Sequence, residues 1–268
     1  MRVLVTGHTG YIGSKLTPML LAKGYDVVGL DTDLFKDCTF TGELADVPHI
    51  WKDVRDVTAE DVAGFDAIIH LAALSNDPLG DYDPGLTETI NDQASVNIAQ
   101  MAKAAGVRRF LFASSCSNYG AAGQDFMKED SPLDPITPYG VSKVAVEKAV
   151  GPLADETFCP VFLRASTAYG VSPRLRFDLV LNNLVAWAFT TGKVMLKSDG
   201  SPWRPVVHVE DICSAYIALL EADEDTVRGR AYNIGTTTEN YQIRDLAETV
   251  AQVVPDCEVS LADDAAPD

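Results

Sequence analysis

The stretch RVLVTGHTGYIG at residues 2–13 decides the fold. Its apolar start predicts a buried strand, and residues 14–23 follow with apolar side chains at helical spacing before Gly24. Glycines in the order GxxGxxG between a strand and a helix permit a tight turn and the close approach of a pyrophosphate. The helix N-terminus supplies the partial positive charge that an anion needs. The stretch therefore predicts a phosphate-binding βα unit, although its spacing departs from GxGxxG.

The second predicted strand, residues 25–30, leads into Asp31. A carboxylate there can accept hydrogen bonds from the ribose diol of an adenosine and would repel a 2′-phosphate, so Asp31 favours NAD over NADP. Nearby acidic residues at positions 33 and 37 would add to the repulsion, but a solvated loop would look the same. A third strand at residues 50–54 contains Asp53, which is either a contact of the adenine amino group or an ordinary turn residue.

Strands and helices then alternate, which predicts a doubly wound parallel α/β sheet. Residues 65–71 form the fourth predicted strand, and the small residues after it would let a dinucleotide lie against the backbone. His70 lies in this apolar run and is interpreted as a buried, satisfied side chain. The remaining elements predicted in this half are helices at 84–105 and 139–150, strands at 108–113 and 158–164, and a loop at 123–138.

Two polar motifs stand at the ends of these elements. Tyr139 and Lys143 are four residues apart, so on a helix they share one face. The ammonium group favours the phenolate and lowers the pKa of the tyrosine, which allows proton exchange with a hydroxyl group near neutral pH. An exposed pair on a surface helix is the alternative. The run SSCSNYG at 114–120 places hydroxyls at the carboxyl end of a strand, where such sheets bind ligands, although serines there are also plain caps.

The pattern changes after Gly170 and predicts a smaller lobe. We expect residues 1–170 to form the dinucleotide-binding domain and 171–268 to form mainly a substrate-binding lobe, with 204–235 partly returning to the main domain. The elements predicted here are helices at 179–190, 211–221 and 241–254, and extended segments at 194–196, 205–209 and 231–235.

The composition argues against several other classes. The chain has 268 residues and a net charge of −18, which argues against nucleic acid and anionic membranes as partners. No apolar run reaches membrane-spanning length, and the N-terminus lacks a signal-peptide pattern. The cysteines are far apart in the sequence, which argues against a metal or redox CxxC site, and their odd number predicts reduced thiols in the cytoplasm. They are Cys38, Cys116, Cys159, Cys213 and Cys257.

Together the motifs resemble those of the extended short-chain dehydrogenase/reductases, specifically the NAD-dependent nucleotide-sugar epimerase/dehydratase group. The resemblance covers nearly the whole chain, in the family's order and spacing. The motifs are GHTGYIG at 7–13, Asp31, Asp53-Val54, HLAAL at 70–74, Asn91 with Asn97, SSCSNYG at 114–120, PYGVSK at 138–143, LRASTAYG at 163–170, RPVVHVEDI at 204–212 and YNIG at 232–235. The resemblance implies a Rossmann-type fold, NAD as cofactor and a nucleoside-diphosphate (NDP) sugar as substrate.

The resemblance also implies a role for individual residues. Tyr139 is the acid/base toward the sugar C4 oxygen, Lys143 holds the nicotinamide ribose, and Ser115 hydrogen-bonds the same sugar oxygen. Arg204 matches a position that binds the substrate diphosphate, and Arg174 and Arg176 are further candidates that a solvated helix start would explain equally well. Cofactor contacts are expected at Gly7, Gly10, Tyr11, Ile12, Gly13, Asp31, Asp53, Val54, Leu71, Ala72, Ala73, Tyr139 and Lys143. Substrate contacts are expected at Ser115, Ser117, Thr167, Arg174 and Arg204.

Departures from the family pattern select the reaction. The 4,6-dehydratases carry an Asp-Glu pair where Cys116 and Ser117 stand, and neither of these is a carboxyl acid or base. The family's 3,5-epimerases have a cysteine at the position of Ser117, one residue away from Cys116. Thr167 replaces a frequent asparagine, and family members usually continue well past YNIG and its helix. An acid/base set without extra carboxyls predicts a 4-epimerase that recycles NAD.

Three alternatives to this prediction remain open. They are an NDP-4-keto-sugar reductase, a dehydratase that uses other acids, and a non-enzymatic NAD(P)-sensing protein of the same fold. The sequence does not identify the sugar or its nucleotide. Because the family often forms homodimers through the helices at 84–105 and 139–150, we also expect a dimer.

Overall fold

The computed structural model describes residues 1–75, 82–120 and 126–266. Its centre is a seven-stranded sheet in the order β10-β6-β5-β4-β1-β2-β3, in which every neighbouring pair is parallel. The predicted doubly wound parallel sheet is therefore confirmed. Its strands are β1 (Arg2–Thr6), β2 (Asp26–Asp31), β3 (His49–Trp51), β4 (Ala67–His70), β5 (Arg109–Ser115), β6 (Cys159–Ala165) and β10 (Ala231–Ile234).

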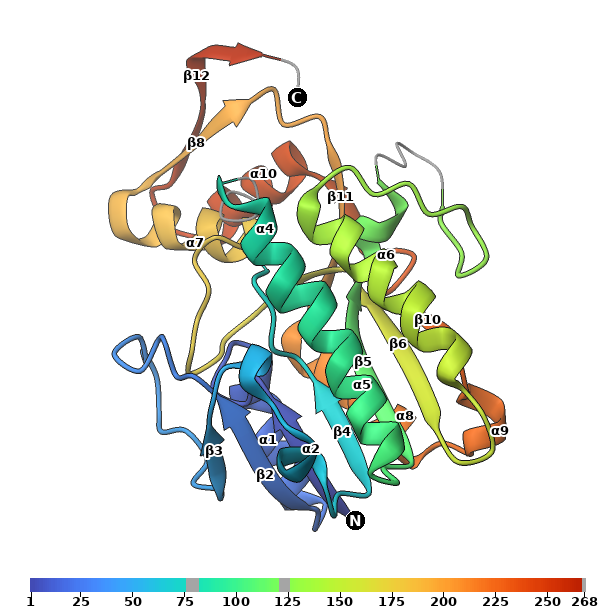
Figure 1. Cartoon of the computed structure of the whole chain (residues 1–268). Coiled ribbons are helices and arrows are strands. Elements are labelled where there is room, and N and C mark those ends of the chain that lie inside the picture. Colours follow the sequence, from blue (N-terminus) through green and yellow to red (C-terminus); the bar gives the residue numbers. More distant parts are fainter. Residues whose placement is uncertain (76–81, 121–125, 267–268) are drawn as a thin grey trace.

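Helices cover both faces of this sheet. In Figure 1, α5 and α6 lie on the face turned to the viewer, and α1 and α8 lie behind the sheet. Alternate residues of β1 show why the strands are apolar throughout: Val3 and Val5 pack toward α1 and α8, whereas Leu4 packs toward α5 and α6. The helices of this half are α1 (Gly13–Ala22), α2 (Ala59–Val62), α4 (Pro84–Thr87), α5 (Ala94–Ala104), α6 (Pro138–Val150), α8 (Val209–Glu221) and α9 (Glu224–Val227).

The helix predicted at 84–105 contains a π-helical stretch that the sequence did not indicate. Between α4 and α5, residues Glu88–Gln93 form π-type turns. Asn91 in this stretch is fully buried, and its side chain both accepts from the N–H of Leu74 (2.7 Å) and donates to the carbonyl of Leu74 (2.8 Å). The π-helical stretch thus fixes the segment that follows β4, which borders the expected cofactor site.

The smaller lobe has its own apolar cluster, built from α7 (Val180–Thr191), β8 (Lys193–Ser198), β9 (Trp203–His208) and α10 (Ile243–Val253). Three strands in the second half of the chain were not predicted: β7 (Thr167–Tyr169), β11 (Asn240–Gln242) and β12 (Glu258–Ala266). Each forms by pairing with β8 or β9. β10 and α8 pack with the main sheet rather than with this lobe.

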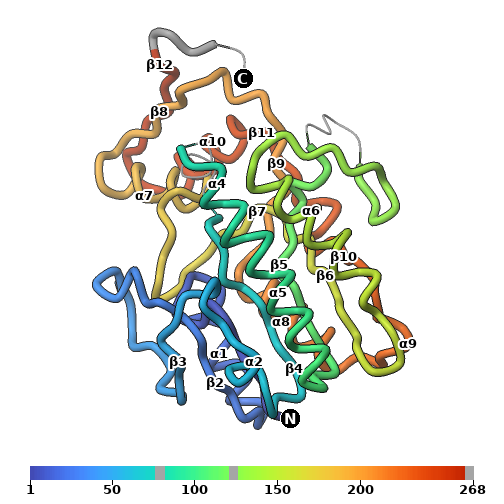
Figure 2. Tube along the Cα trace, in the orientation of Figure 1, coloured from blue at the N-terminus to red at the C-terminus, as the bar shows by residue number. Residues whose placement is uncertain are grey.

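Residues 170–178 form a strap that connects β7 to α7 across the glycine-rich loop. Figure 2 shows this yellow segment running down beside the blue N-terminal part of the chain. The hydroxyl of Tyr11 donates to the carbonyl of Gly170 (2.8 Å), and the hydroxyls of Ser14 and Ser172 are 2.9 Å apart. The N–H of Phe40 donates to the carbonyl of Pro173 (2.9 Å). The strap therefore ties the smaller lobe to two loops of the main domain.

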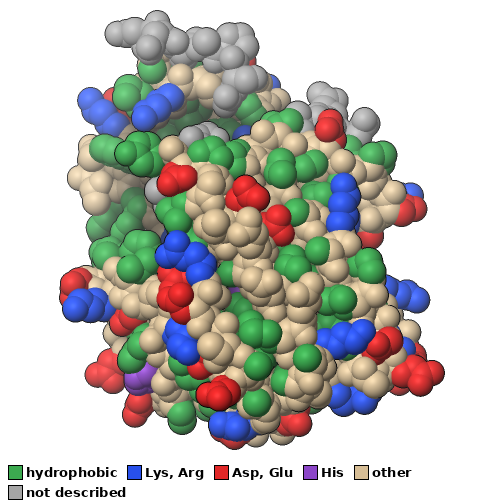
Figure 3. Space-filling model, in the orientation of Figure 1, with side chains coloured by type: hydrophobic (Ala, Val, Ile, Leu, Met, Phe, Trp, Pro, Cys, Tyr) green, Lys and Arg blue, Asp and Glu red, His purple; other side chains and the backbone are tan. Residues whose placement is uncertain are grey.

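Apolar side chains also gather on the outside of the smaller lobe. Three such side chains on α7 are exposed: Val185, Trp187 and Phe189. Figure 3 shows apolar surface at the left of the view, on the side of the molecule where α7 lies. No helix among the described residues is both long and apolar enough to cross a membrane.

Candidate functional site

The glycine-rich loop lies directly against the segment that follows β4. Gly7 has φ +73°, and a Cβ at this position would lie 2.8 Å from the backbone nitrogen of Ala72. A Cβ at Gly13 would overlap the carbonyl oxygen of Gly7. The absence of side chains leaves a flat backbone surface at the N-terminus of α1, which suits the close approach of a pyrophosphate. The glycine-rich loop thus lies beside Leu71 and Ala72. All of these residues were expected to contact one cofactor.

Asp31 ends β2 beside this loop. Its carboxylate accepts from the N–H of Thr9 (3.1 Å) and from the N–H of Asp33 (3.0 Å). Asp53 caps the turn after β3 and forms a two-point ion pair with Arg55 (3.0 and 2.8 Å). This pairing and the hydrogen bonds from Arg55 hold the pKa of Asp53 below its usual range. The glycine cradle and the oriented carboxylate of Asp31 together fit the pyrophosphate and adenosine ribose of NAD.

The candidate catalytic residues come from the end of β5 and the start of α6. Ser115 caps the short helix after β5, where its oxygen accepts from the N–H of Ser117 (3.1 Å). Tyr139 and Lys143 lie one turn apart on α6, which begins at a Thr137 cap. A Cβ at Gly140 would lie 3.0 Å from the carbonyl oxygen of Ser117. Glycine therefore lets the first turn of α6 approach residues 114–119, which we call the serine turn.

Lys143 is almost completely enclosed, with 2% of its surface exposed. Its ammonium nitrogen lies 5.3 Å from the centre of the Tyr139 ring and 4.7 Å from the centre of the Phe112 ring. Burial lowers the pKa of Lys143 to about 7. While protonated, the ammonium group favours ionisation of the neighbouring phenol.

His70 ends β4, near enough to Lys143 for the lysine charge to act on it. Its ring nitrogens are 2.7 Å from the Thr6 hydroxyl and 2.9 Å from the Ser95 hydroxyl. Burial, with a smaller contribution from the Lys143 charge, lowers the pKa of His70 to about 3. The interpretation of His70 as a buried and satisfied side chain is confirmed.

Arg204 lies near enough to Cys116 for its charge to act on the thiol. Burial raises the pKa of the Cys116 thiol to about 11, although the positive charge of Arg204 opposes this rise. Arg204 is exposed at the start of β9, and it donates to the carbonyl of Trp203 (3.0 Å). Thr167 on β7 is paired with Val206 on β9. Thr167 and Arg204 therefore stand near each other, on the smaller-lobe side of the turn.

A hollow of about 210 Å³ adjoins the start of β9. It is lined by Phe126, Trp203, Thr237 and Asn240. Since Trp203 directly precedes Arg204, this hollow lies close to the cation expected to bind the substrate diphosphate.

Arg174, one of the candidate substrate contacts, forms an ion pair with Asp33. Its side chain is 6% exposed and donates to the carboxylate of Asp33 (2.9 Å), at the end of the sheet that carries Asp31. Arg174 therefore lies beside the loop that follows β2. Arg176 donates to the side chain and carbonyl of Ser75 (2.7 and 3.0 Å) and so connects the strap to the segment after β4.

Two buried charges at the site were missed from the sequence. Glu147 on α6 and Arg164 on β6 form an ion pair (2.6 Å) in which both side chains are less than 10% exposed. The available signal was spacing, since Tyr139, Lys143 and Glu147 recur every four residues and so share one helix face. Among the residues that the structure describes, no group of three or more His, Cys, Asp or Glu side chains is arranged to hold a metal ion.

Comparison with known proteins gives consistent results. The model of the family described as "NAD dependent epimerase/dehydratase family" matches residues 3–235. The UDP-glucose 4-epimerase of Mycolicibacterium smegmatis is 30% identical over 265 residues, which cover 95% of this chain and 83% of that protein.

Solved structures of similar proteins include both epimerases and a dehydratase. The UDP-glucose 4-epimerase of Thermus thermophilus, solved in complex with NAD, is 27% identical with a TM-score of 0.84, covering 100% of this chain and 87% of that one. TunA, an NAD-dependent NDP-hexosamine 5,6-dehydratase of tunicamycin biosynthesis, is 25% identical with a TM-score of 0.87, covering 98% and 84%.

Proposed function

The chain belongs to the NAD dependent epimerase/dehydratase family, and we propose that it inverts C4 of a nucleoside-diphosphate sugar through a transient 4-keto sugar. The predicted family and its Rossmann-type fold are confirmed, and the family is NAD-dependent. UDP-glucose is the substrate that we propose to test first, because several curated relatives are UDP-glucose 4-epimerases.

One observation carries the proposal. The phenol of Tyr139 lies against the enclosed ammonium group of Lys143, and the first turn of α6 touches the turn that carries Ser115. This set can remove and return a proton at a sugar hydroxyl. The neighbouring positions hold Cys116 and Ser117, so the turn supplies no carboxyl acid for the elimination of water.

The residues divide the work as follows in this proposal. Tyr139, ionised beside Lys143, accepts the proton of the C4 hydroxyl, while the Ser115 hydroxyl donates a hydrogen bond to the same oxygen. NAD, when bound, supplies the acceptor and then the donor of the C4 hydride. After the keto sugar turns over, Tyr139 returns its proton to the C4 oxygen, so the chain regains its starting protonation state.

The binding residues follow from their positions. The glycine-rich loop would hold the pyrophosphate and Asp31 the adenosine ribose, as the sequence predicted. Arg204, Ser117 and Thr167 remain the proposed substrate contacts. Arg174 is assigned to the cofactor side, where its ion pair with Asp33 supports the loop after β2.

We also propose a homodimer formed by α5 and α6 of two chains as a four-helix bundle. Val141 on α6 is 52% exposed, so this helix offers apolar surface to a partner. Light scattering at micromolar concentration should give twice the mass of one chain, 28.9 kDa. A monomer mass would contradict the dimer without affecting the proposed chemistry.

A second candidate is dehydration with Cys116 as a proton donor. Burial keeps this thiol protonated at neutral pH by raising its pKa, and TunA, a dehydratase, has a similar fold. The product separates the two candidates: epimerisation yields an NDP-sugar of unchanged mass, whereas dehydration removes one water.

Two measurements test the proposal. The first denatures a sample of the purified protein and measures the nucleotide that it releases. The second incubates native protein with UDP-glucose and identifies the product by NMR. We expect about one NAD per chain and formation of UDP-galactose, with Tyr139→Phe inactive but still NAD-loaded. Net release of NADH, or a product lighter by one water, would contradict the proposal.

A further inference from the structure

A buried carboxylate joins the two segments that carry the active-site residues. Glu147 lies on α6, one turn beyond Lys143, and its side chain is 8% exposed. We propose that Glu147 is a positioning residue, which fixes the turn containing Ser115 against the helix containing Tyr139 and Lys143. This inference rests on the proposed function, because it assigns a purpose to the alignment of those three residues.

The contacts of Glu147 hold the turn on both sides of Ser115. One carboxylate oxygen accepts from the hydroxyl of Ser114 (2.5 Å) and from the amide of Asn118 (3.0 Å). Ser114 directly precedes Ser115, and Asn118 lies three residues after it. The same amide also donates to the Ser114 hydroxyl (3.1 Å), so the two ends of the turn are tied together. A shift of Glu147 would therefore move the whole turn relative to α6.

Arg164 anchors this carboxylate to the sheet. It donates to Glu147 through two nitrogens (3.0 and 2.6 Å) and to the hydroxyl of Tyr119 (2.8 Å). Tyr119 in turn donates to the side chain of Asn233 on β10 (2.6 Å). The hydrogen-bonded groups thus come from α6, β5, β6 and β10. Their hydrogen bonds hold these elements in fixed positions relative to one another.

An apolar cluster of the same size would serve stability at least as well. Burying two charges costs desolvation, and replacing such a pair by well-packed apolar residues is often neutral or stabilising. Directional hydrogen bonds to a carboxylate, in contrast, define the position of each donor. The presence of a charged network immediately under the active-site turn is therefore better explained by alignment than by stability.

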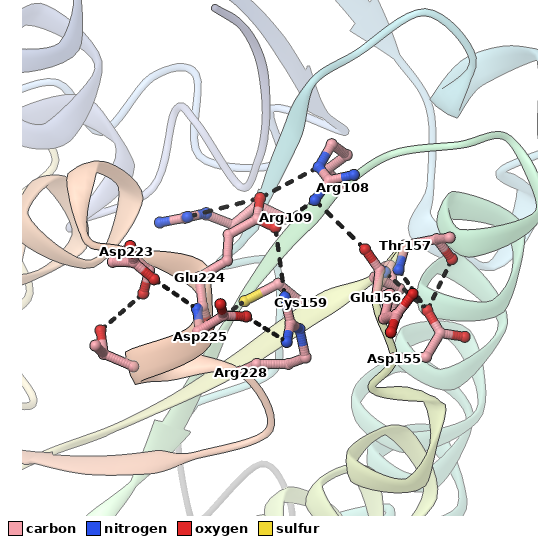
Figure 4. A network of polar contacts seen from close by, with 12 residues as sticks. Arg108, Arg109, Asp155, Glu156, Thr157, Cys159, Asp223, Glu224, Asp225 and Arg228 are labelled. Atoms are coloured by element: carbon pink, nitrogen blue, oxygen red, sulfur yellow. Dashed lines mark hydrogen bonds and ion pairs between the residues drawn. The ribbon is translucent and has the colours of Figure 1, made fainter.

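The opposite end of the same strands offers a matched control. Figure 4 shows Glu224 of α9 paired with Arg108, just before β5, and with Arg228. Glu224 is 23% exposed and Arg108 is 56% exposed. This pair also ties a helix to β5, but it lies at the amino end of the strand, away from Ser115.

The first experiment compares Glu147→Gln with Glu224→Gln, using UDP-glucose and rates per folded protein. Because a misplacement of about 1 Å can cost about 100-fold in rate, we expect kcat of Glu147→Gln to fall by about 10- to 100-fold, with KM changed less than about threefold. Glu224→Gln should retain the kcat of the unsubstituted protein. A loss of stability without loss of kcat in Glu147→Gln would overturn the proposal.

A double substitution separates positioning from general damage. If Glu147 acts through Ser115, adding Ser115→Ala to Glu147→Gln should lower kcat far less than Ser115→Ala does alone. In the Glu224→Gln background, Ser115→Ala should have its full effect. Two losses that simply multiply in the Glu147→Gln background would overturn the proposal. Ser114→Ala removes the two hydrogen bonds of the Ser114 hydroxyl, with Glu147 and Asn118, but keeps the ion pair of Glu147 with Arg164. It provides a milder variant if Glu147→Gln does not fold.

Hydrogen exchange tests the same link without any substrate. Glu147→Gln or Ser114→Ala should increase amide exchange in residues 114–119, and Glu224→Gln should not. Unchanged exchange in this turn would overturn the positioning role. If the unsubstituted protein fails to convert UDP-glucose, the proposed reaction fails for that substrate, whereas the exchange result still decides whether Glu147 holds the turn.

Discussion

The ammonium nitrogen of Lys143 lies 5.3 Å from the centre of the Tyr139 ring and is enclosed by protein. Burial lowers the pKa of this lysine to about 7, so the charge that favours the Tyr139 phenolate is itself partly lost at neutral pH. The charge beside Tyr139 at neutral pH therefore depends on how deeply the fold buries this lysine.

Lys143→Met should reveal this burial as a pH-dependent difference in stability. The free lysine has a pKa of 10.5 and the folded one about 7, so between these values the unfolded chain binds more protons. The free energy of unfolding of the unsubstituted protein therefore rises with pH over this window. The variant should be the more stable protein at pH 7, with a gap that narrows toward pH 10. Urea unfolding of the NAD-free proteins measures this difference in the free energy of unfolding. A difference that does not change with pH would refute the lowered pKa of Lys143.

His70 should contribute sensitivity to acid. Its pKa is 6.5 when free and about 3 when buried, so below pH 6.5 the unfolded chain binds more protons and stability falls as the pH falls. His70→Leu loses the contacts with Thr6 and Ser95, which should cost about 1–3 kcal/mol at pH 7. Its stability should then decline less than that of the unsubstituted protein between pH 6.5 and 4. Urea unfolding measures both free energies of unfolding. If they fall equally with pH in the variant and in the unsubstituted protein, His70 does not titrate in this way.

Cys116→Ser should leave epimerisation nearly intact. The thiol has a pKa of about 11, so it is protonated at neutral pH and is not a base. A serine hydroxyl is also neutral, and we expect kcat within about threefold of the unsubstituted value. The thiol should also react slowly with iodoacetamide at pH 7, since the thiolate is the reactive form. A large fall in kcat would instead favour the dehydratase candidate, in which Cys116 donates a proton.

Arg174→Ala should weaken retention of NAD. Its buried guanidinium pairs with Asp33 and so connects the strap to the loop after β2. Loss of this connection should accelerate NAD dissociation by about tenfold, the equivalent of about 1.4 kcal/mol. The control is Arg228→Ala, which breaks an ion pair with Asp225 far from the strap. Equal NAD content and equal dissociation rates in the two variants would refute this role.

Much of the fold could be predicted because its signals are local. The apolar strands, the glycine-rich loop and the four-residue spacing of Tyr139 and Lys143 are each visible within a few residues. The strand β12 could not be predicted in this way, since it exists only through pairing with β8. The position of Arg174 was equally hidden, because its partner Asp33 is 141 residues away in the sequence.

In the candidate site, too, local motifs could be predicted from the sequence, but contacts between distant segments could not. Ser115, Tyr139 and Lys143 follow from motifs, but the alignment between their two segments depends on Glu147 and Arg164, which come from separate elements. The four-residue spacing from Tyr139 and Lys143 was a visible sign at position 147. Its partner could be known only once β6 was placed beside α6.

In the proposed reaction a hydride leaves C4 of the sugar and returns to the same carbon. The direct measurement is incubation of the NAD-loaded protein with UDP-glucose deuterated at C4 of the sugar, followed by NMR of the product. We expect UDP-galactose with the deuterium retained at C4 and no net release of NADH. Loss of deuterium to solvent, or a product that has lost water, would contradict it.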